Sequence, residues 1–391
     1  MNILVLNWYD LLNPAAGGAE RYLFEIFSRL VGQGHRVTLV CQSFPGSQKI
    51  ELVMGIRVVR LHTHAKGLLG KSCQTIGRSF MYYARHHREY DMIVEFVNKI
   101  PYFTPLYARQ EERVALQCHF NSCTFRLEYP KIGWLFQMIE RLYFRLFYTR
   151  EKFIVISPGT QSDLDTYGIC SDRSELIYSG IDCPSLQVSP SQKPTIVYLG
   201  RLQRYKSVDV LLKAMVGVVQ QIPEAILRVM GNGRDRKRLT ELVSELGIES
   251  NVVFEGYVSE QKKWEILAGA WLHANPSRKE GWGINVFEAA CYRVPSVASR
   301  VPGLCDAVKD GVTGRLVEYG NVPQLAETIV ELLQDHQQRI AMGDHAYKFS
   351  LGFTWDSSAQ QMERYLGHLL EPQIQRVPLP FLTELRFPNP L

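Results

Sequence analysis

The sequence predicts an α/β protein built from two doubly wound parallel-sheet domains that face each other across a central cleft. The chain has 391 residues, enough for two domains of ordinary size, each with its own core. Short apolar runs alternate with helical segments in both halves, a pattern typical of parallel sheets covered by helices on both faces. Between the halves, residues 185–194 are rich in Ser, Gln and Pro, which is the composition of a linker.

The first half opens with an apolar strand over 2–6. Periodic apolar residues then predict an amphipathic helix from Ala19 to about Leu30. Short apolar runs predict further strands over 37–41, 56–61, 92–94, 114–118, 153–156 and 176–178. Together these elements form a first domain, 1–185.

A second alternation of the same kind begins directly after the linker. The strands predicted there lie over 195–199, 226–230, 252–254, 271–274, 296–298 and 315–317, with helices between them. They form a second domain, 194–354, and ligands of such sheets bind at the carboxyl ends of the strands. The remaining segment, 355–391, holds a helix over 355–370 and a tail with five prolines. We expect this segment to pack back on the first domain, and the sequence leaves open whether the tail is disordered or lies along the surface.

The overall composition is that of a soluble globular protein, with 46% hydrophobic and 21% charged residues. No apolar run reaches the length of about 18 residues that a conventional membrane span requires. The strand over 2–6 has no basic segment before it, so it does not predict a signal peptide. We therefore expect a cytoplasmic protein.

The eight cysteines are scattered along the chain, and none form a Cys-x-x-Cys pair. Cys118 and Cys123 are the closest two, and they have no matching second pair. The spacing therefore predicts neither a zinc site nor a disulfide framework, and a reducing compartment fits best.

Basic residues concentrate in the region 49–88, which holds eight Lys or Arg and one acidic residue, Glu51, giving a local net charge of +7. Four histidines lie in the same region. Its cations include Lys66, Lys71, Arg78, Arg85 and Arg88. Residues 67–70, Gly-Leu-Leu-Gly, interrupt the charges and predict a short apolar loop. Such a field favours an anionic partner.

A second notable region, 134–150, is dense in aromatic residues. They are Trp134, Phe136, Tyr143, Phe144, Phe147 and Tyr148. Aromatic residues at helical spacing usually belong to a protein core. The alternative is a surface that meets lipid, with Arg141, Arg145 and Arg150 near the headgroups. The sequence leaves both open.

The segment 275–290 carries two carboxylates, Glu280 and Glu288, with seven residues between them. It follows the strand 271–274 and leads into an apolar-periodic helix, 284–291, so its glycines lie in a strand-to-helix turn where a ligand can approach the backbone. Glu280 is expected in the turn and Glu288 roughly two turns into the helix, with both facing one crevice. An ordinary turn followed by a solvated helix is the alternative interpretation.

Two further loops lie where the cleft is expected. Gly17 and Gly18 join the first strand to the first helix and allow close backbone approach to a ligand. After the strand 195–199, Arg201 and Lys206 place two permanent cations at the mouth of the cleft. Fixed cations of this kind can stabilise negative charge that grows on a leaving group, without a metal ion.

These segments resemble, in order, the motifs of the retaining glycosyltransferase family 4, the glycosyl transferases of group 1 with the GT-B fold. The Glu-x7-Glu pair, Gly-Gly-Ala-Glu over 17–20 and Gly-Arg-Leu followed by Lys over 200–206 carry the resemblance. Ile156-Ser157 and the segments 177–182, 231–233, 254–258 and 301–303 also match. Ser179 stands where the family usually has Asn. The resemblance covers about residues 2–370.

The resemblance implies a hexosyltransferase that moves a hexose from a UDP- or GDP-linked sugar to a hydroxyl of a glycan or lipid-linked acceptor. The configuration at the sugar would be retained, as in polysaccharide or glycolipid biosynthesis. The donor would bind mainly to the second domain and the acceptor mainly to the first. Neither a metal nor any cofactor besides the nucleotide sugar is expected, and nucleic acid is not expected as a partner.

The resemblance also assigns roles to single residues. Glu280 would hold hydroxyls of the transferred sugar, Glu288 the ribose, and Arg201 with Lys206 the diphosphate. His119, at the cleft edge, would position the reacting sugar by hydrogen bonding. The expected catalytic residues are His119, Arg201, Lys206 and Glu280. The other expected donor-binding residues are Gly17, Gly18, Tyr257, Val258, Gly283, Ile284, Asn285 and Glu288, and no residue is expected to bind a metal.

Other motifs point to competing interpretations. Asp163-Leu164-Asp165 spells a metal-binding motif of another glycosyltransferase fold, but residues two apart on a helix face different directions. Gly231-Asn232-Gly233 starts like a dinucleotide fingerprint, yet Arg236 occupies the position of its third glycine. A dinucleotide-dependent oxidoreductase is thus disfavoured. A non-catalytic nucleotide-sugar-binding partner of another glycosyltransferase remains the main alternative.

The basic region 49–88 belongs to the acceptor side in this family. We therefore expect an anionic, lipid-linked acceptor, reached by peripheral attachment to the inner face of the cytoplasmic membrane. A solvated basic face that serves a soluble acceptor is the alternative.

Overall fold

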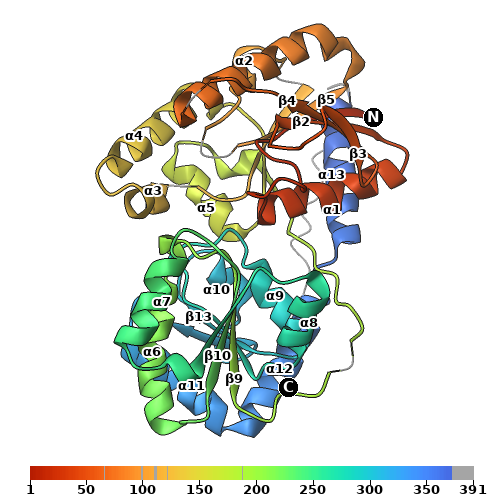
Figure 1. Ribbon diagram of the computed structural model, residues 1–391. Helices are drawn as coiled ribbons and strands as arrows, with labels where there is room; N and C mark the ends of the chain where they lie inside the picture. The colour runs from red at the N-terminus through yellow and green to blue at the C-terminus, as the bar shows by residue number, and fades with distance from the viewer. Residues whose placement is uncertain (66, 98–99, 110–111, 121, 187, 372–391) are drawn as a thin grey trace.

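The computed structural model describes residues 1–65, 67–97, 100–109, 112–120, 122–186 and 188–371 and shows two α/β domains, one above the other in Figure 1. Each domain is built on its own parallel-stranded sheet. This arrangement confirms the fold class predicted from the sequence. The two domains share one apolar cluster, in which Tyr178 of the first domain packs on Trp282 of the second with ring centroids 4.7 Å apart.

The sheet of the first domain has the strand order β3-β4-β2-β1-β5-β6-β7-β8. Its strands are β1 Asn2–Leu6, β2 Arg36–Gln42, β3 Ile50–Val53, β4 Ile56–Leu61, β5 Met92–Phe96, β6 Arg113–Gln117, β7 Phe153–Val155 and β8 Ser174–Leu176. Its helices are α1 Gly18–Gly32, α2 Leu68–His86, α3 Ser122–Glu128, α4 Gly133–Tyr143 and α5 Pro158–Thr166. Apart from Asn2, the central strands β1, β5 and β6 are buried along their whole length, as the continuous apolar runs predict.

In the basic region, one strand was not predicted and one prediction is wrong. The strand is β3, which pairs antiparallel with β4 at the edge of the sheet. A tight turn joins these strands, because Met54 and Gly55 both adopt positive φ, 51° and 80°. The apolar loop expected over 67–70 is instead the start of α2, which begins at Leu68. Lys66 lies outside the described residues.

The sheet of the second domain has the order β11-β10-β9-β12-β13-β14, and all its pairs are parallel. Its strands are β9 Thr195–Leu199, β10 Ile226–Met230, β11 Val252–Gly256, β12 Leu272–Asn275, β13 Ser296–Ser299 and β14 Gly314–Val317. Its helices are α6 Val208–Gln221, α7 Arg236–Glu245, α8 Glu260–Ala268, α9 Ile284–Ala290, α10 Leu304–Ala307, α11 Val322–Gln334 and α12 His336–Ser350. In Figure 1 the sheet lies between α6 and α7 on one side and α8 and α9 on the other.

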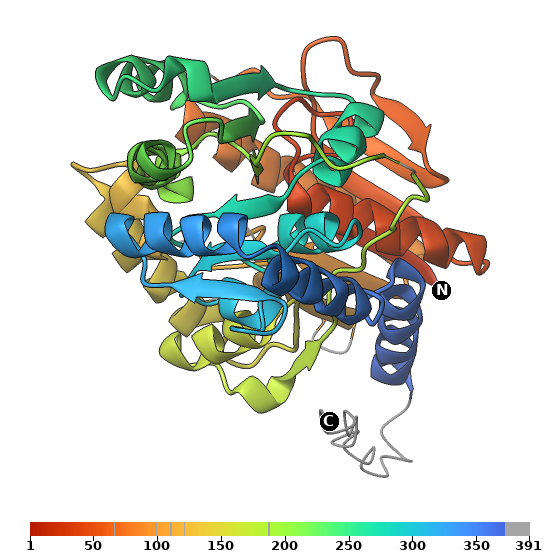
Figure 2. The same ribbon diagram turned by 90° about the horizontal axis from the view of Figure 1, so that it is seen from below.

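The last described helix, α13 (Trp355–Leu370), leaves the second domain and packs beside α1 of the first (Figures 1 and 2). Its first residue, Trp355, is fully buried and meets the ring of Tyr22 edge-on. An ion pair of 2.6 Å between Arg29 Nε and Asp356 Oδ1 adds a polar contact at the rim. The Pro-rich tail, 372–391, lies outside the described residues.

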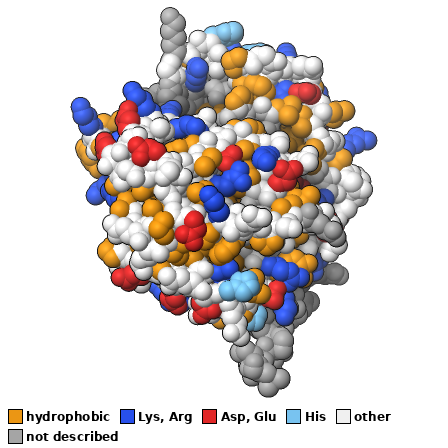
Figure 3. Space-filling model, turned by 60° about the horizontal axis from the view of Figure 1, so that its bottom comes forward, with side chains coloured by type: hydrophobic (Ala, Val, Ile, Leu, Met, Phe, Trp, Pro, Cys, Tyr) orange, Lys and Arg blue, Asp and Glu red, His pale blue; other side chains and the backbone are white. Residues whose placement is uncertain are grey.

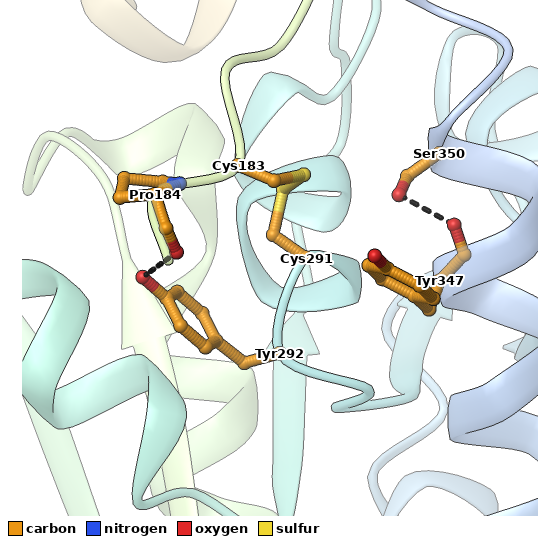
Figure 4. The surroundings of a disulfide bond; sticks show 6 residues. All are labelled: Cys183, Pro184, Cys291, Tyr292, Tyr347 and Ser350. Atoms are coloured by element: carbon orange, nitrogen blue, oxygen red, sulfur yellow. Dashed lines mark hydrogen bonds between the residues drawn. A yellow bond between two sulfur atoms is a disulfide. The ribbon is translucent and has the colours of Figure 1, made fainter. Parts of the chain in front are cut away.

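A disulfide between Cys183 and Cys291 links two segments that are 108 residues apart in the sequence (Figure 4). Cys183 lies after β8, at the end of the first domain, and Cys291 directly follows α9 of the second. Beside the bond, the hydroxyl of Tyr292 donates to the carbonyl of Pro184 at 3.0 Å. The expectation that no disulfide forms is therefore wrong. Its basis was local spacing, whereas this pair is brought together only by the folded arrangement of both domains.

Among the described residues, no helix is both long enough and apolar enough to cross a membrane. Figure 3 brings the second domain toward the viewer and shows Lys and Arg interspersed with Asp and Glu over that face. Neither sign of charge dominates there.

Candidate functional site

The site lies where the loops of the two domains meet. A Cβ placed on Gly17 would lie 3.7 Å from Cζ of Arg201, and one on Gly18 would lie 3.7 Å from Cδ1 of Ile284. The first loop of the first domain therefore touches both the loop after β9 and the start of α9. A Cβ on Gly281 would lie 2.6 Å from the carbonyl oxygen of Cys118, so only glycine fits this crossing. The structure brings the predicted loops into contact with one another.

Glu280 and Lys206 form the central ion pair of this cleft, with 2.6 Å between Oε1 and Nζ. The hydroxyl of Ser277 and the amide of Asn275 donate to the same Oε1, at 2.8 and 3.3 Å. Desolvation raises the pKa of Glu280, but the charge and hydrogen bond of Lys206, with these two donors, hold it below its ordinary value. Glu280 is therefore a fixed carboxylate with a positive charge beside it.

The turn after β12 places Glu280 through a short polar network. Asn275, the last residue of β12, donates to Oδ1 of Asn285 at 3.1 Å, and Asn285 in turn donates to the carbonyl of Leu199 at 2.7 Å. Gly283 precedes α9 with φ 74°, in the left-handed region that favours glycine. These hydrogen bonds thus hold the loops after β9 and β12 in a fixed position relative to each other.

Glu288 lies on α9, which has only seven residues. It therefore stands just over one turn from Ile284, and the expected depth of roughly two turns is wrong. Its Oε1 accepts from Lys263 Nζ at 2.8 Å and from Arg21 Nη1 at 2.9 Å. Both Glu288 and Lys263 are buried. Glu280 and Glu288 have separate sets of partners.

Arg21 and Lys263 are site residues that the sequence analysis missed. Arg21 directly follows the Gly-Gly-Ala-Glu motif, so its position in the first turn of α1 was a usable signal. Lys263 belongs to α8, where nothing in its surroundings in the sequence distinguishes it from a solvated lysine. Its burial against a carboxylate is visible only in the fold.

Arg201 reaches into the cleft from the loop after β9, and its side chain is exposed. Its Nη2 donates to the hydroxyl of Tyr205 at 3.1 Å, which fixes the guanidinium near the first loop. Lys206 ends the short 3₁₀ turn over 204–206. Both predicted cations therefore belong to the segment after β9, and Arg201 lies against Gly17 of the first domain.

His119 follows β6 at the cleft edge and is partly exposed. Desolvation, followed by the charges of Arg201, Lys206 and Lys279, lowers the pKa of His119 to about 4. The imidazole is therefore neutral at physiological pH, and it can donate or accept one hydrogen bond without adding charge.

Glu20 stabilises the first loop by hydrogen bonding. It is buried, its Oε2 accepts from the backbone nitrogen of Gly17 at 2.8 Å, and its Oε1 accepts from the Asn7 amide at 3.1 Å. Desolvation raises the pKa of Glu20. The Glu of the Gly-Gly-Ala-Glu motif thus shapes the loop.

Three other predicted positions differ in their surroundings. Tyr257 follows the edge strand β11 and is 91% exposed, whereas Val258 is partly buried. Ser179 is buried, and its hydroxyl has no hydrogen-bond partner among the described residues. An Asn, the usual residue there, has more hydrogen-bonding groups than Ser. Ser179 therefore changes the hydrogen bonds that this position can form.

The Asp163-Leu164-Asp165 segment lies on α5. Asp163 forms an ion pair with Lys279 of the second domain, and Asp165 accepts from the backbone nitrogen of Ser171. Leu164 is buried between them. Over the described part of the chain, no cluster of His, Cys, Asp and Glu has the arrangement of a metal site.

In both the basic region, 49–88, and the aromatic region, 134–150, the fold buries some of the residues and exposes others. Arg60 is buried and bonds to Asp10 and Glu51, so it does not contribute to the surface field. In the aromatic region, Tyr143 and Phe144 are buried, as a core predicts, while Trp134 is exposed. The core interpretation therefore holds for the buried side chains of that region, and Trp134 lies on its exposed side.

Two α/β domains with sheets of this topology, and a polar site where they meet, are typical of the GT-B fold. Two family models together match most of the chain and indicate the same class of protein. The model described as Glycosyltransferase Family 4 matches residues 16–184, and the model described as Glycosyl transferases group 1 matches residues 186–349. The chain belongs to the group 1 glycosyltransferases of the GT-B fold.

Curated relatives support the same family. The D-inositol 3-phosphate glycosyltransferase of Corynebacterium aurimucosum is 31% identical over 231 residues, which cover 57% of this chain and 53% of that protein. Its counterpart in Corynebacterium urealyticum is 36% identical over 180 residues, covering 44% and 42%. The matched region thus spans about half the length of these relatives.

Solved structures share the fold. A sucrose-phosphate synthase from Thermosynechococcus elongatus superposes with a TM-score of 0.81 at 21% identity, covering 94% of this chain and 98% of that one. HepE of Anabaena, solved in complex with UDP and glucose, gives a TM-score of 0.74 at 20% identity, covering 94% and 100%. At these identities the similarity concerns the fold alone.

Proposed function

We propose that this protein is a retaining, metal-independent glycosyltransferase. It moves a hexose from a UDP- or GDP-linked donor to a hydroxyl of a glycan or lipid-linked acceptor. The observation that carries the proposal is the Lys206–Glu280 pair, together with Arg201 of the same domain, which lies against Gly17 of the first loop. A cation pair for a diphosphate and a fixed carboxylate for sugar hydroxyls stand in one closed cleft.

The donor fits these groups in a defined order. Arg201 and Lys206 bind the diphosphate, and Glu280 accepts hydrogen bonds from hydroxyls of the hexose. The donors to Glu280 among the described residues all contact Oε1, which leaves Oε2 for the sugar. Glu288 holds the ribose through its second oxygen, since Arg21 and Lys263 both contact Oε1. Gly283, Ile284 and Asn285 offer backbone contacts, and exposed Tyr257 with Val258 lies where a base can stack.

The reaction breaks the bond between the sugar C1 and the phosphate oxygen and forms a bond between C1 and the acceptor oxygen. The proton of the acceptor hydroxyl passes to the departing phosphate oxygen on the same face of the sugar, so configuration is retained. Negative charge grows on the diphosphate as the bond breaks, and preorganised cations stabilise it most in the transition state. Neutral His119 orients the sugar by hydrogen bonding.

Relatives support parts of this proposal. HepE is described with UDP-glucose, which is a donor of the proposed class. The curated relatives are named for D-inositol 3-phosphate, an anionic acceptor. In this chain the exposed cations Lys71, Arg85 and Arg88 give the first domain a surface that attracts an anionic acceptor. We propose a cytoplasmic location with peripheral attachment to the inner face of the membrane.

A panel of nucleotide sugars tests the proposal. A ligand that binds only the folded protein raises its melting temperature, by an amount set by its concentration relative to Kd. We expect one UDP- or GDP-sugar to raise it with and without EDTA, and to be consumed when acceptor is added. Binding without turnover on any acceptor would favour the non-catalytic partner. No shift with any donor would overturn the proposal.

A further inference from the structure

One side of α4 exposes large apolar side chains to solvent. The surface continues into η4 (Phe144–Tyr148), the π-helical turn that follows α4. Its members are each between 44% and 62% exposed, and we call them the α4 face: Ile132, Trp134, Met138, Ile139, Leu142 and Leu146. A surface helix ordinarily places polar residues on this side, and a contiguous apolar patch marks an interaction site.

The other side of α4 and η4 packs against the first domain, and this packing keeps the α4 face exposed to solvent. Phe144 is fully buried, and its ring lies 5.0 Å from that of Phe120. At the start of α4, a Cβ on Gly133 would lie 2.4 Å from the carbonyl oxygen of Phe125, so α3 and α4 form one tightly packed pair. Rotation of α4 would expose this aromatic core, and the apolar face therefore stays at the surface.

The exposed charges on α4, on η4 and directly before α4 have one sign. Lys131, Arg141 and Arg145 are exposed along it. Glu140 is the only acidic residue between 131 and 150, and it is buried, where it accepts from the hydroxyl of Tyr167 at 2.7 Å. An apolar strip bordered by cations is complementary to an anionic lipid surface, because the apolar side chains enter the acyl boundary while the cations meet headgroup phosphates.

We propose that the α4 face docks this protein on an anionic phospholipid bilayer. The proposal deepens the proposed function and rests on it for its biological purpose. α4 packs on α3, and α3 contacts the turn over 204–206 that carries Lys206. Docking through α4 thus brings the bilayer beside the entrance of the cleft, on the acceptor side, where a lipid-linked acceptor can enter without leaving the membrane.

The α4 face also replaces the apolar loop that the sequence analysis expected to enter the headgroups. Residues 67–70 contain the start of α2, and Arg60 of the same region is buried. The exposed cations of 49–88 still attract anionic lipid at long range. The apolar side chains that can enter the lipid, however, lie on the α4 face beside its own cations.

Vesicle flotation of the purified protein tests this proposal. We expect binding to vesicles of phosphatidylcholine with phosphatidylglycerol, and little binding to phosphatidylcholine alone. The variant Trp134→Ser/Leu142→Ser should bind about tenfold more weakly or worse, because each lost side chain removes apolar area from the lipid contact. The matched control, Leu52→Ser/Leu351→Ser, changes two exposed apolar residues elsewhere and should bind like wild type.

The charge contribution is tested in the same way. Arg141→Gln/Arg145→Gln should weaken binding to anionic vesicles several-fold, and by more than Arg85→Gln/Arg88→Gln in the region 49–88. Equal binding by Trp134→Ser/Leu142→Ser and wild type would overturn the proposal, as would wild type that stays unbound at low salt. Self-association that these substitutions abolish, without vesicle binding, would assign the face to a second copy of the chain.

The vesicle assay needs neither donor nor turnover. A normal melting-temperature shift with the preferred nucleotide sugar in the docking variants shows that the donor site is intact. Failure of docking and failure of the proposed function are thereby separate outcomes.

Discussion

Arg21 of the first domain and Glu288 of the second lie 2.9 Å apart, Nη1 to Oε1, and join the two domains across the cleft. A second ion pair across the cleft connects Asp163 with Lys279. The contact between the two domains at the candidate site is therefore stabilised by side chains from both of them.

Removing both pairs should open the cleft. Partly exposed ion pairs contribute about 1 kcal/mol or less each, enough to change the open population several-fold. We expect Arg21→Gln/Lys279→Gln to increase the radius of gyration in small-angle scattering. The control Arg293→Gln breaks an exposed pair inside the second domain and should leave it unchanged. A double variant as compact as wild type would show that these pairs do not hold the domains together.

Activity should survive EDTA. In the proposed mechanism, Arg201 and Lys206 supply the two positive charges that a divalent cation would otherwise bring to the diphosphate. The measurement is the transfer rate after dialysis against chelator, with the melting temperature as a control for folding. A rate that falls with EDTA and recovers with magnesium or manganese would contradict this assignment of the leaving-group chemistry.

The lowered pKa of His119 should make stability depend on pH. The unfolded imidazole has a pKa of 6.5 and the folded one a pKa of about 4, so the folded state binds fewer protons between these values. The contribution of His119 is therefore complete above pH 6.5 and lost as the pH falls toward 4. It amounts to up to about 3 kcal/mol.

The comparison is between denaturant unfolding of wild type and of His119→Asn from pH 7 to pH 4. The variant should lose less stability over this range, while the exposed control His87→Asn should follow wild type. Parallel curves for wild type and His119→Asn would show that the imidazole is not desolvated in the cleft.

The disulfide fixes how many cysteine thiols can react before the protein is reduced. Of eight cysteines, six should react in denatured protein that has not been reduced, and all eight after reduction. Cross-linking residues 108 apart should raise the free energy of unfolding by about 2 to 4 kcal/mol relative to Cys183→Ser. Eight reactive thiols before reduction would mean that the bond is absent. The count in protein taken rapidly from cells also tests the cytoplasmic location, since that compartment keeps thiols reduced.

The sequence was most informative where structure is local. The strand over 195–199 and the helix over 355–370 were predicted to the residue, because continuous apolar runs and helical periodicity report burial directly. β3 was missed because it is an exposed edge strand with alternating burial and a charged residue, Glu51, in its centre. Its turn residues, Met54 and Gly55, were the available signal.

Contacts between distant segments could not be predicted from spacing. The Cys183–Cys291 bond and the burial of Lys263 against Glu288 depend on the docking of elements far apart in the chain. In the aromatic region, composition identified the helix but not its orientation, so the split between buried Tyr143 and exposed Trp134 required the fold. The roles of the cleft residues remain predictions that kinetics must test.

The central claim is that Glu280 and Lys206 act on the donor as its sugar–phosphate bond breaks. The most direct test is the transfer rate of Glu280→Ala and of Lys206→Ala, with the donor identified by the nucleotide-sugar panel. Each variant should keep its fold by circular dichroism and lose about two orders of magnitude or more in turnover, since one preorganised group can contribute about 3 kcal/mol to the transition state. Near-normal turnover in either folded variant would contradict the account.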